Sequence, residues 1–298
     1  MKKACISVIS SRTRCLKPCL ESLWKHYNNK HNYPVYVYYF DDIYDSEDTR
    51  ADIISTCVQN VIFQRIEYNT PEHIAEEELF YNRKHLWYVY TGRFGPHRKG
   101  YLHMCHFMSN AYGYPDTHFH EYEYNISIDD ESMFVKDVPY DFPDVISDRE
   151  DDMGAMKVTR WVKKQPHQGN FDCRVGLWDF IKDYLNKYNL EPKGQFLKDL
   201  LTDPEADKNF HFYPMCDSYC IKTKMFQSNE WKQWIDEINA SGGIYKYRWG
   251  DNDVISLFYH VYYDQFVYDY GTVDEGYHNQ GALRHVQDYA PSIKDFGR

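Results

Sequence analysis

A strand-like run that ends in three adjacent carboxylates is the feature that most constrains this chain. Residues of the segment 123–131 alternate between apolar and polar, and the segment closes on Asp129, Asp130 and Glu131. Adjacent carboxylates repel one another, so a folded protein normally keeps them together around a cation or a cationic partner. Carboxylate oxygens suit Mg²⁺ or Mn²⁺, which proteins commonly hold between carboxylates and a substrate phosphate. Because open α/β sheets bind ligands at the carboxyl ends of strands, the triplet predicts a metal-assisted site for a phosphorylated donor; a solvated acidic turn is the alternative.

Composition allows one large core and argues against some functions. The chain has 298 residues, of which 43% are hydrophobic, so it can bury a sizeable core as one large domain or two closely joined lobes. Its formal charge of −11 argues against a non-specific nucleic-acid binder, and we rank a nuclease last for the same reason. The 29 tyrosines offer flat faces that suit sugar rings, although many tyrosines simply line a core.

The cysteines and the N-terminus give weaker signals. Cys15/Cys19 and Cys216/Cys220 are each four apart, but no zinc-ligand spacing completes a set. We therefore expect mostly reduced, partly buried thiols, and leave open one disulfide-linked pair. The apolar run after Met1 is too short for a signal sequence or a membrane span, which predicts a cytoplasmic chain or a catalytic portion cut free of an anchor.

The order of expected elements is that of an α/β fold. Apolar runs at 4–10, 35–40 and 61–66 are typical of strands, and an apolar stripe at helical spacing lies between the first two. Strand, helix, strand at this spacing begins a parallel βαβ layout. Further helices are expected at 99–110, 177–188, 229–238 and 254–263. In the first of these, His103 and His106 are expected at the surface or as caps, with a ligand role as the alternative.

Polar groups follow the first two expected strands. Arg12 and Arg14 come after the first, and Asp41 and Asp42 after the second. A guanidinium matches phosphate oxygens, and a carboxylate after a second strand can accept hydrogen bonds from a base or a ribose. Neither a GxGxxG nor a GxxxxGK[ST] motif is present, so these residues predict a nucleotide site without either glycine-rich fingerprint.

Three blocks of unusual residues occur in order along the chain. They are Gly100-Tyr-Leu-His-Met-Cys-His-Phe107, Gly242-Gly-Ile-Tyr-Lys-Tyr-Arg-Trp-Gly-Asp251 and Asp274-Glu-Gly-Tyr-His278. They resemble the segments Tyr-Arg-x-Met-Cys-Arg-Phe, Gly-Gly-Phe-Tyr-Glu-Arg-Trp-Gly-Asp and Asp-Ile-Gly-Tyr-x-His of the fungal α-1,2-mannosyltransferases of glycosyltransferase family 15. The resemblance covers most of the chain, and the Arg-Trp-Gly-Asp block behind a double glycine is its most specific part.

The resemblance implies a GT-A fold: α/β, with a mixed but mostly parallel central sheet flanked by helices. It implies one domain over residues 1–298, in which 1–130 bind the nucleotide sugar and 131–298 bind the acceptor and supply catalysis. It also implies Mn²⁺ (or Mg²⁺), a nucleotide-sugar donor, and transfer that retains the anomeric configuration.

The metal and donor positions of the family carry over to the acidic triplet and to the C-terminal block. The acidic triplet occupies the position of the family's Glu-Pro-Asp site. By this resemblance Asp129 and Glu131 are expected to bind the metal, and Asp129 and Asp130 are expected to bind the nucleotide-sugar donor. His278 takes the place of the metal-ligating histidine, at that position or one before it.

Other functional positions carry over singly. Tyr101 and Asp251 match active-site positions of the family, and Arg12 and Asp42 lie where its early loops hold the nucleotide. A cap of the helix beginning near residue 252 is the structural alternative for Asp251.

Two segments depart from the family pattern. Residues 124–129 replace Trp-Arg-Val-Glu-Pro-Asp with Tyr-Asn-Ile-Ser-Ile-Asp, which loses an arginine and a glutamate. Residues 215–219 replace a segment whose glutamate is the family's candidate nucleophile, and Asp217 is the nearest carboxylate there. Asp217 or Asp251 is therefore our candidate for the group that stabilises an oxocarbenium-like sugar or traps it covalently.

These features predict a metal-dependent retaining glycosyltransferase that moves a hexose, by resemblance mannose from GDP-mannose, to a glycan hydroxyl. A non-catalytic glycan-binding protein on a degenerate transferase fold is the alternative, favoured by the missing glutamate and the many tyrosines. The expected partners are a nucleotide-sugar donor and a glycan or glycoprotein acceptor, with no nucleic acid and no membrane segment in this chain. Members of the family are Golgi-anchored.

Overall fold

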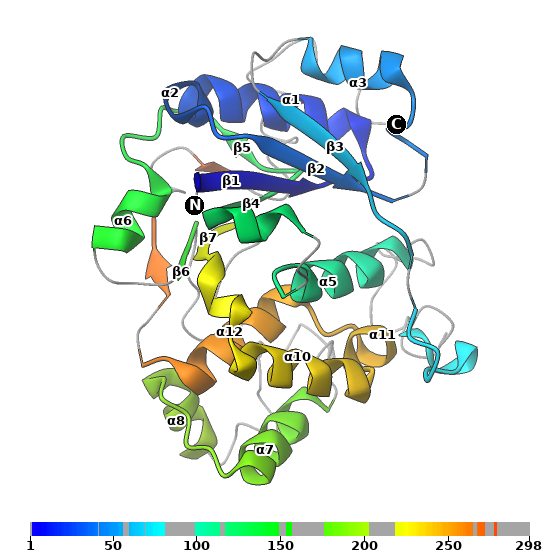
Figure 1. The fold of residues 1–298 in the computed structure, drawn as a ribbon, viewed down its shortest axis with the longest axis vertical. Coiled ribbons are helices and arrows are strands. Elements are labelled where there is room, and N and C mark those ends of the chain that lie inside the picture. The colour runs from blue at the N-terminus through cyan, green and yellow to red at the C-terminus, as the bar shows by residue number, and fades with distance from the viewer. Residues whose placement is uncertain are drawn as a thin grey trace, which may run out of the picture.

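A computed structural model of the chain shows a central sheet between layers of helices (Figure 1). The structure describes residues 2–40, 42–55, 60–68, 70–80, 99–113, 117–148, 153–156, 176–202, 218–264, 267–271 and 277–278.

The central sheet has seven strands in this described part, in the order β3-β2-β1-β4-β7-β6-β8. Their bounds are β1 (Lys2–Ile9), β2 (Val35–Tyr39), β3 (Val61–Arg65), β4 (Tyr122–Asp129), β6 (Met153–Ala155), β7 (Tyr219–Lys222) and β8 (Tyr268–Asp269). Strands β3, β2, β1 and β4 run parallel, β7 pairs antiparallel with β4 and β6, and β6 pairs parallel with β8. The predicted mixed, mostly parallel α/β sheet is confirmed. A separate pair of strands joins β5 (Met133–Phe134) to β9 (Tyr277–His278).

Helices cover both faces of the sheet. Their bounds are α1 (Thr13–Leu23), α2 (Asn29–His31), α3 (Glu47–Ile54), α5 (Lys99–Ala111), α6 (Phe142–Asp148), α7 (Leu177–Tyr188), α8 (Gln195–Thr202), α10 (Asn229–Ser241), α11 (Gly243–Tyr247) and α12 (Asp251–Tyr262). In Figure 1, α1, α2 and α3 lie above the sheet, α5 lies below it with α10, α11 and α12 beneath, and α7 and α8 are outermost. The helices predicted from periodicity are all present. Helix α10 ends at Gly242, which adopts φ 69°, the left-handed conformation that glycine tolerates best.

The alternation of side chains along β1 explains why helices pack on both faces. Ile6 and Val8 belong to the apolar cluster under α1, with Leu16 and Leu20 of that helix. Cys5, which directly precedes Ile6 on the strand, belongs to the cluster on the opposite face. Because neighbouring side chains on a strand point to opposite faces, a strand that is apolar throughout must be covered on both sides.

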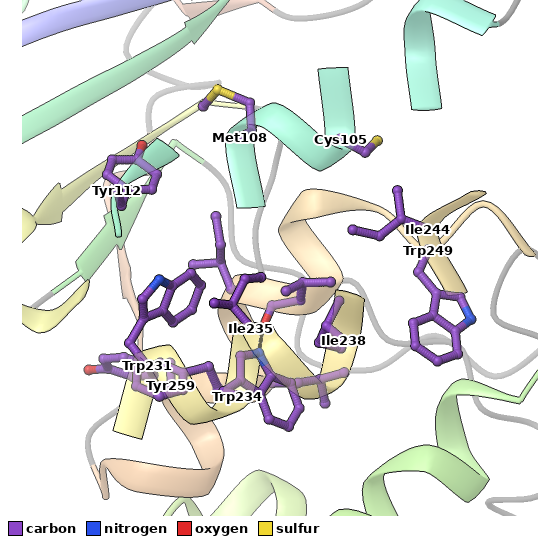
Figure 2. Packing of buried hydrophobic residues seen from close by; sticks show 14 of the residues in the cluster. Cys105, Met108, Tyr112, Trp231, Trp234, Ile235, Ile238, Ile244, Trp249 and Tyr259 are labelled. Carbon is purple, nitrogen blue, oxygen red and sulfur yellow. Dashed lines mark hydrogen bonds between the residues drawn. The ribbon is translucent and has the colours of Figure 1, made fainter. Parts of the chain in front are cut away.

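The larger cluster fills the space below the sheet, where tryptophans of α10 meet α5 and α12 (Figure 2). Trp231 and Trp234 are fully buried, and the Nε1–H of Trp234 donates to the Val254 carbonyl at 3.1 Å. Met108 of α5 and Tyr112, which directly follows that helix, face this group from the sheet side. Helices α10 and α12 are thereby fixed relative to α5, on which part of the site is built.

Several smaller expectations can now be compared with the structure. The prediction that His103 lies at the surface is wrong: its ring is buried, with Nδ1 3.2 Å from the Tyr245 hydroxyl. All five cysteines in the described part are buried and outside any disulfide, as expected for reduced thiols. No helix in the described ranges has the length and apolar character needed to cross a bilayer.

One buried and two half-buried histidines predict a pH-dependent stability. Burial lowers the pKa of His106 and of His260 to about 4 and that of His118 to about 3, against an ordinary 6.5. Between these values the unfolded chain takes up protons that the folded chain does not, so the free energy of unfolding falls as pH drops from 6.5 toward 4. For His260, a full shift corresponds to about 1.4 kcal/mol lost per pH unit in that window.

Urea unfolding at pH 7.5 and at pH 5 measures this effect. The variant His260→Gln removes one titrating group, and we expect a shallower loss of stability on acidification than in the wild type. Identical pH slopes for the two proteins would show that His260 is not held neutral by burial.

Candidate active site

The carboxyl ends of the four parallel strands define one edge of the sheet, to the right in Figure 1. Ile9, the last residue of β1, lies in register with Asp129, the last residue of β4. The loop after β1 and the acidic turn after β4 therefore leave the sheet side by side. This is where open α/β sheets bind ligands, and it brings Arg12 to the acidic triplet.

Arg12 contacts two of the three acids of the triplet. Its Nε donates to Asp130 Oδ2 at 3.3 Å, a second nitrogen donates to Asp130 Oδ1, and a third donates to Glu131. Burial alone would lower the pKa of Arg12, but the carboxylates of Asp130 and Glu131 raise it overall, so the guanidinium stays charged. Arg12 therefore supplies part of the positive charge expected beside the three adjacent carboxylates.

Asp130 differs from its two neighbours. Its side chain is only 1% exposed, and its Oδ2 also accepts from the Ser10 hydroxyl at 2.7 Å, which lies 2.8 Å from the Tyr44 hydroxyl. Both carboxylate oxygens of Asp130 thus accept hydrogen bonds from Arg12 or Ser10, so Asp130 fixes the orientation of the Arg12 guanidinium. Ser10 and Tyr44 were not singled out from the sequence, although Ser10 directly follows the first apolar run.

Asp129 and Glu131 are the partly exposed acids of the turn. The backbone N–H of Asp129 donates to Ser218 Oγ at 3.1 Å, and the hydroxyls of Ser218 and Ser132 are 3.2 Å apart. Ser218 immediately follows Asp217 in sequence, and Asp217 itself lies outside the described residues.

Backbone pairing places His278, near the C-terminus, next to the segment that follows the acidic turn. In the β5–β9 pair, His278 lies opposite Met133, two residues after Glu131 in the chain. Only the backbone of His278 is described. Among the side chains that the structure describes, no three His, Cys, Asp or Glu residues form a ready-made metal cluster. The hard carboxylate oxygens of Asp129 and Glu131, with an imidazole-bearing strand beside them, are a donor set that suits Mn²⁺ or Mg²⁺.

A second group of predicted residues lies where α5 meets the α11–α12 connection. The guanidinium carbon of Arg248 stands 4.2 Å from the centre of the Tyr101 ring. Burial, with the nearby Cys105 and Asp251, raises the pKa of Tyr101 well above its ordinary value, and Arg248 only partly opposes this. Tyr101 therefore keeps its proton and can act as a hydrogen-bond donor. The structure thus brings Tyr101 and Asp251 together, and it adds Arg248, which the sequence blocks contained but did not assign.

Asp251 is the first residue of α12, and Gly250 occupies the cap position before it. The side chain is buried, and its negative charge is favoured at the positive end of the helix. Asp251 therefore lies in the first turn of α12, and Gly250 is the N-cap.

The double glycine of the same block explains how this connection is fixed. A Cβ on Gly243 would lie 2.2 Å from the Trp249 ring, so the indole packs directly on the glycine backbone. Trp249 also packs against Phe180 of α7, with ring centres 5.3 Å apart. This packing sets the chain direction of residues 248–251, in which Arg248 adopts φ 63°.

Asp42 follows β2 at the same edge, with its side chain exposed and its carbonyl accepting from the Asp45 N–H at 3.0 Å. It shares the edge with Arg12, whose side-chain nitrogens donate to Asp130 and Glu131. Asp41 lies outside the described residues.

A mixed, mostly parallel sheet flanked by helices is the architecture of GT-A-type glycosyltransferases, and solved structures share this fold. Core-mannan synthase A from Aspergillus fumigatus, in its Mn/GDP form, superimposes with a TM-score of 0.70 at 18% identity, over 89% of this chain and 71% of that one. The mannosyltransferase Ktr4p from S. cerevisiae in complex with GDP gives 0.70 at 20% identity, over 88% and 67%.

The chain belongs to the glycolipid 2-alpha-mannosyltransferase family, which it matches over residues 1–288. Among curated relatives, the probable mannosyltransferase YUR1 of Saccharomyces cerevisiae is 23% identical over 257 residues, 80% of this chain and 56% of the relative. The O-glycoside alpha-1,2-mannosyltransferase homolog 5 of Schizosaccharomyces pombe is 22% identical over 260 residues, 80% of this chain and 60% of the relative. The chain thus spans less than two thirds of the length of these relatives.

Gly243→Ala tests the packing that fixes the Arg248–Asp251 segment. The added methyl would overlap the Trp249 ring at 2.2 Å, so we expect a loss of about 1–3 kcal/mol in the free energy of unfolding. The matched control is Gly100→Ala in α5, where the nearest atom would be the Tyr68 hydroxyl at 3.7 Å. In a helix this control should be neutral or slightly stabilising. Urea unfolding measures the stability of both variants. A Gly243→Ala protein as stable as wild type would contradict the packing of the Trp249 ring on the Gly243 backbone.

Proposed function

We propose that this chain is a divalent-metal-dependent retaining glycosyltransferase. It would move a hexose, mannose from GDP-mannose, to a hydroxyl of a glycan or glycoprotein acceptor. The observation that carries the proposal is the meeting of Arg12, the acidic turn and the His278 strand at one sheet edge. Family membership and the shared fold with proteins solved with Mn and GDP support it.

Asp129, Glu131 and His278 would hold the metal, Mn²⁺ or Mg²⁺. When bound, such an ion offsets the negative charge that builds on the diphosphate as it leaves. The nucleotide would be held largely by residues 1–130, with Asp42 accepting from the base or ribose, and the acceptor by residues 131–298.

Arg12 would bind the diphosphate in an orientation set by Asp130. A guanidinium has five N–H donors, and the contacts with Asp130 and Glu131 use one on each of its three nitrogens. Two donors remain that these contacts do not use, enough for a charge-assisted pair of hydrogen bonds to phosphate oxygens.

The groups around α5 and α12 would act on the sugar. Asp251, or Asp217, would face the oxocarbenium-like ring and stabilise its positive charge. Tyr101, whose raised pKa keeps it protonated, would donate a hydrogen bond at the reacting centre. In a retaining transfer of this kind, the departing phosphate can itself receive the proton of the acceptor hydroxyl.

Thermal unfolding with Mn²⁺ and GDP, followed by a donor-hydrolysis assay, tests the proposal. Wild type is expected to gain stability when both are present, because a ligand that binds only the folded state stabilises it by mass action. Glu131→Gln should lose about tenfold or more in affinity, which removes about 1.4 kcal/mol of that gain. Asp52→Asn on α3, whose side chain is 71% exposed and pairs with Lys17, is the matched control and should behave as wild type.

Full donor hydrolysis in the presence of a chelator would contradict the metal dependence. Binding of a glycan without binding of any nucleotide sugar would favour the non-catalytic alternative instead.

A further inference from the structure

Two aromatic rings stack at the carboxyl edge of the sheet, beside the site described above. Phe40 directly follows β2, and Tyr68 comes three residues after β3. Their ring centres are 4.8 Å apart and their planes differ by 3°. Phe40 is 5% exposed, whereas Tyr68 is 36% exposed. An inner ring therefore supports an outer one that remains open to solvent.

The outer ring is held in place from the inside. The ring of the buried His103 meets Tyr68 edge-on, with centres 4.6 Å apart and planes at 60°. The Tyr68 hydroxyl lies close to Gly100, where a Cβ would stand 3.7 Å away. An exposed aromatic side chain with this support loses little conformational freedom when a second flat group stacks on it.

The aromatic pair lies along the same sheet edge as the residues proposed to bind the diphosphate. Along the edge, the strands run β3, β2, β1 and β4, so the aromatic pair lies at β3 and β2, Arg12 at β1 and the acids at β4. From the end of β2 to the end of β4 is two strand spacings of about 4.8 Å, roughly 10 Å. That span suits a nucleoside diphosphate whose base lies at one end and whose phosphates lie at the other.

We propose that Tyr68, backed by Phe40, is the stacking platform for the nucleobase of the donor. This inference rests on the proposed function and adds to it the residue that positions the base. Every nucleobase has a flat face that can stack on an aromatic ring, and such contacts account for a large part of base affinity in proteins. If Tyr68 only covered the core, its removal would weaken folding without a separate effect on nucleotides.

Calorimetric titration with Mg²⁺ separates these two roles by comparing GDP with inorganic pyrophosphate, which lacks a base. Three variants are compared with wild type: Tyr68→Ala, Tyr68→Phe and Ile54→Ala. Ile54 is an exposed apolar side chain on α3 and serves as the control for removal of surface apolar area. Thermal unfolding of each variant checks that it is folded.

Tyr68→Ala is expected to weaken GDP binding by roughly tenfold to a hundredfold and to leave pyrophosphate binding unchanged. Tyr68→Phe keeps the ring and should bind GDP as wild type does, as should Ile54→Ala. Unchanged GDP binding by Tyr68→Ala would overturn the inference, as would equal weakening of GDP and pyrophosphate. If wild type and Tyr68→Ala bind GDP equally well, only the stacking role is overturned. Wild type that binds no nucleoside diphosphate overturns the proposed function and the platform with it.

Discussion

The contact between Arg12 and Asp130 is the interaction on which the site depends. A carboxylate that is 1% exposed costs several kcal/mol in lost hydration unless a charged partner and further hydrogen bonds compensate. Arg12 and Ser10 provide both, and they come from the loop after β1, whereas Asp130 comes from the turn after β4. The ends of two adjacent strands are therefore tied together, and this directs the chain past Glu131 into β5, opposite the strand that carries His278.

A steric constraint fixes the segment that carries Arg248 and Asp251. Trp249 can lie flat on Gly243 only because no side chain is present there, and the indole packs into the core between α7 and α11. Arg248 then stands over the Tyr101 ring, and Asp251 begins α12. Ion pairing at the sheet edge and packing beneath the sheet thus fix two groups of polar side chains, one around Arg12 and one around Arg248.

Periodicity was enough to predict the sheet and the main helices, because apolar faces must be buried whatever the remaining detail. Chain order also placed Arg12 and the acidic turn each after an expected strand, but only the sheet order shows that these two strands are neighbours. The separate role of Asp130 did not follow, because three adjacent acids look alike until the register of β4 buries one of them. The pairing of Met133 with His278 joins two-residue strands far apart in sequence, which leave no periodic signal. Tyr68 stands in a polar segment and became informative only through its contact with Phe40.

The central claim is that the acidic turn and the C-terminal histidine share one divalent ion. Anomalous diffraction at the manganese edge, from crystals grown with Mn²⁺ and GDP, tests it most directly. We expect one strong peak bonded to Asp129 or Glu131 and to the His278 imidazole, with diphosphate oxygens completing its shell. A peak bound elsewhere, or a His278 side chain turned to the opposite face of the β5–β9 pair, would contradict it.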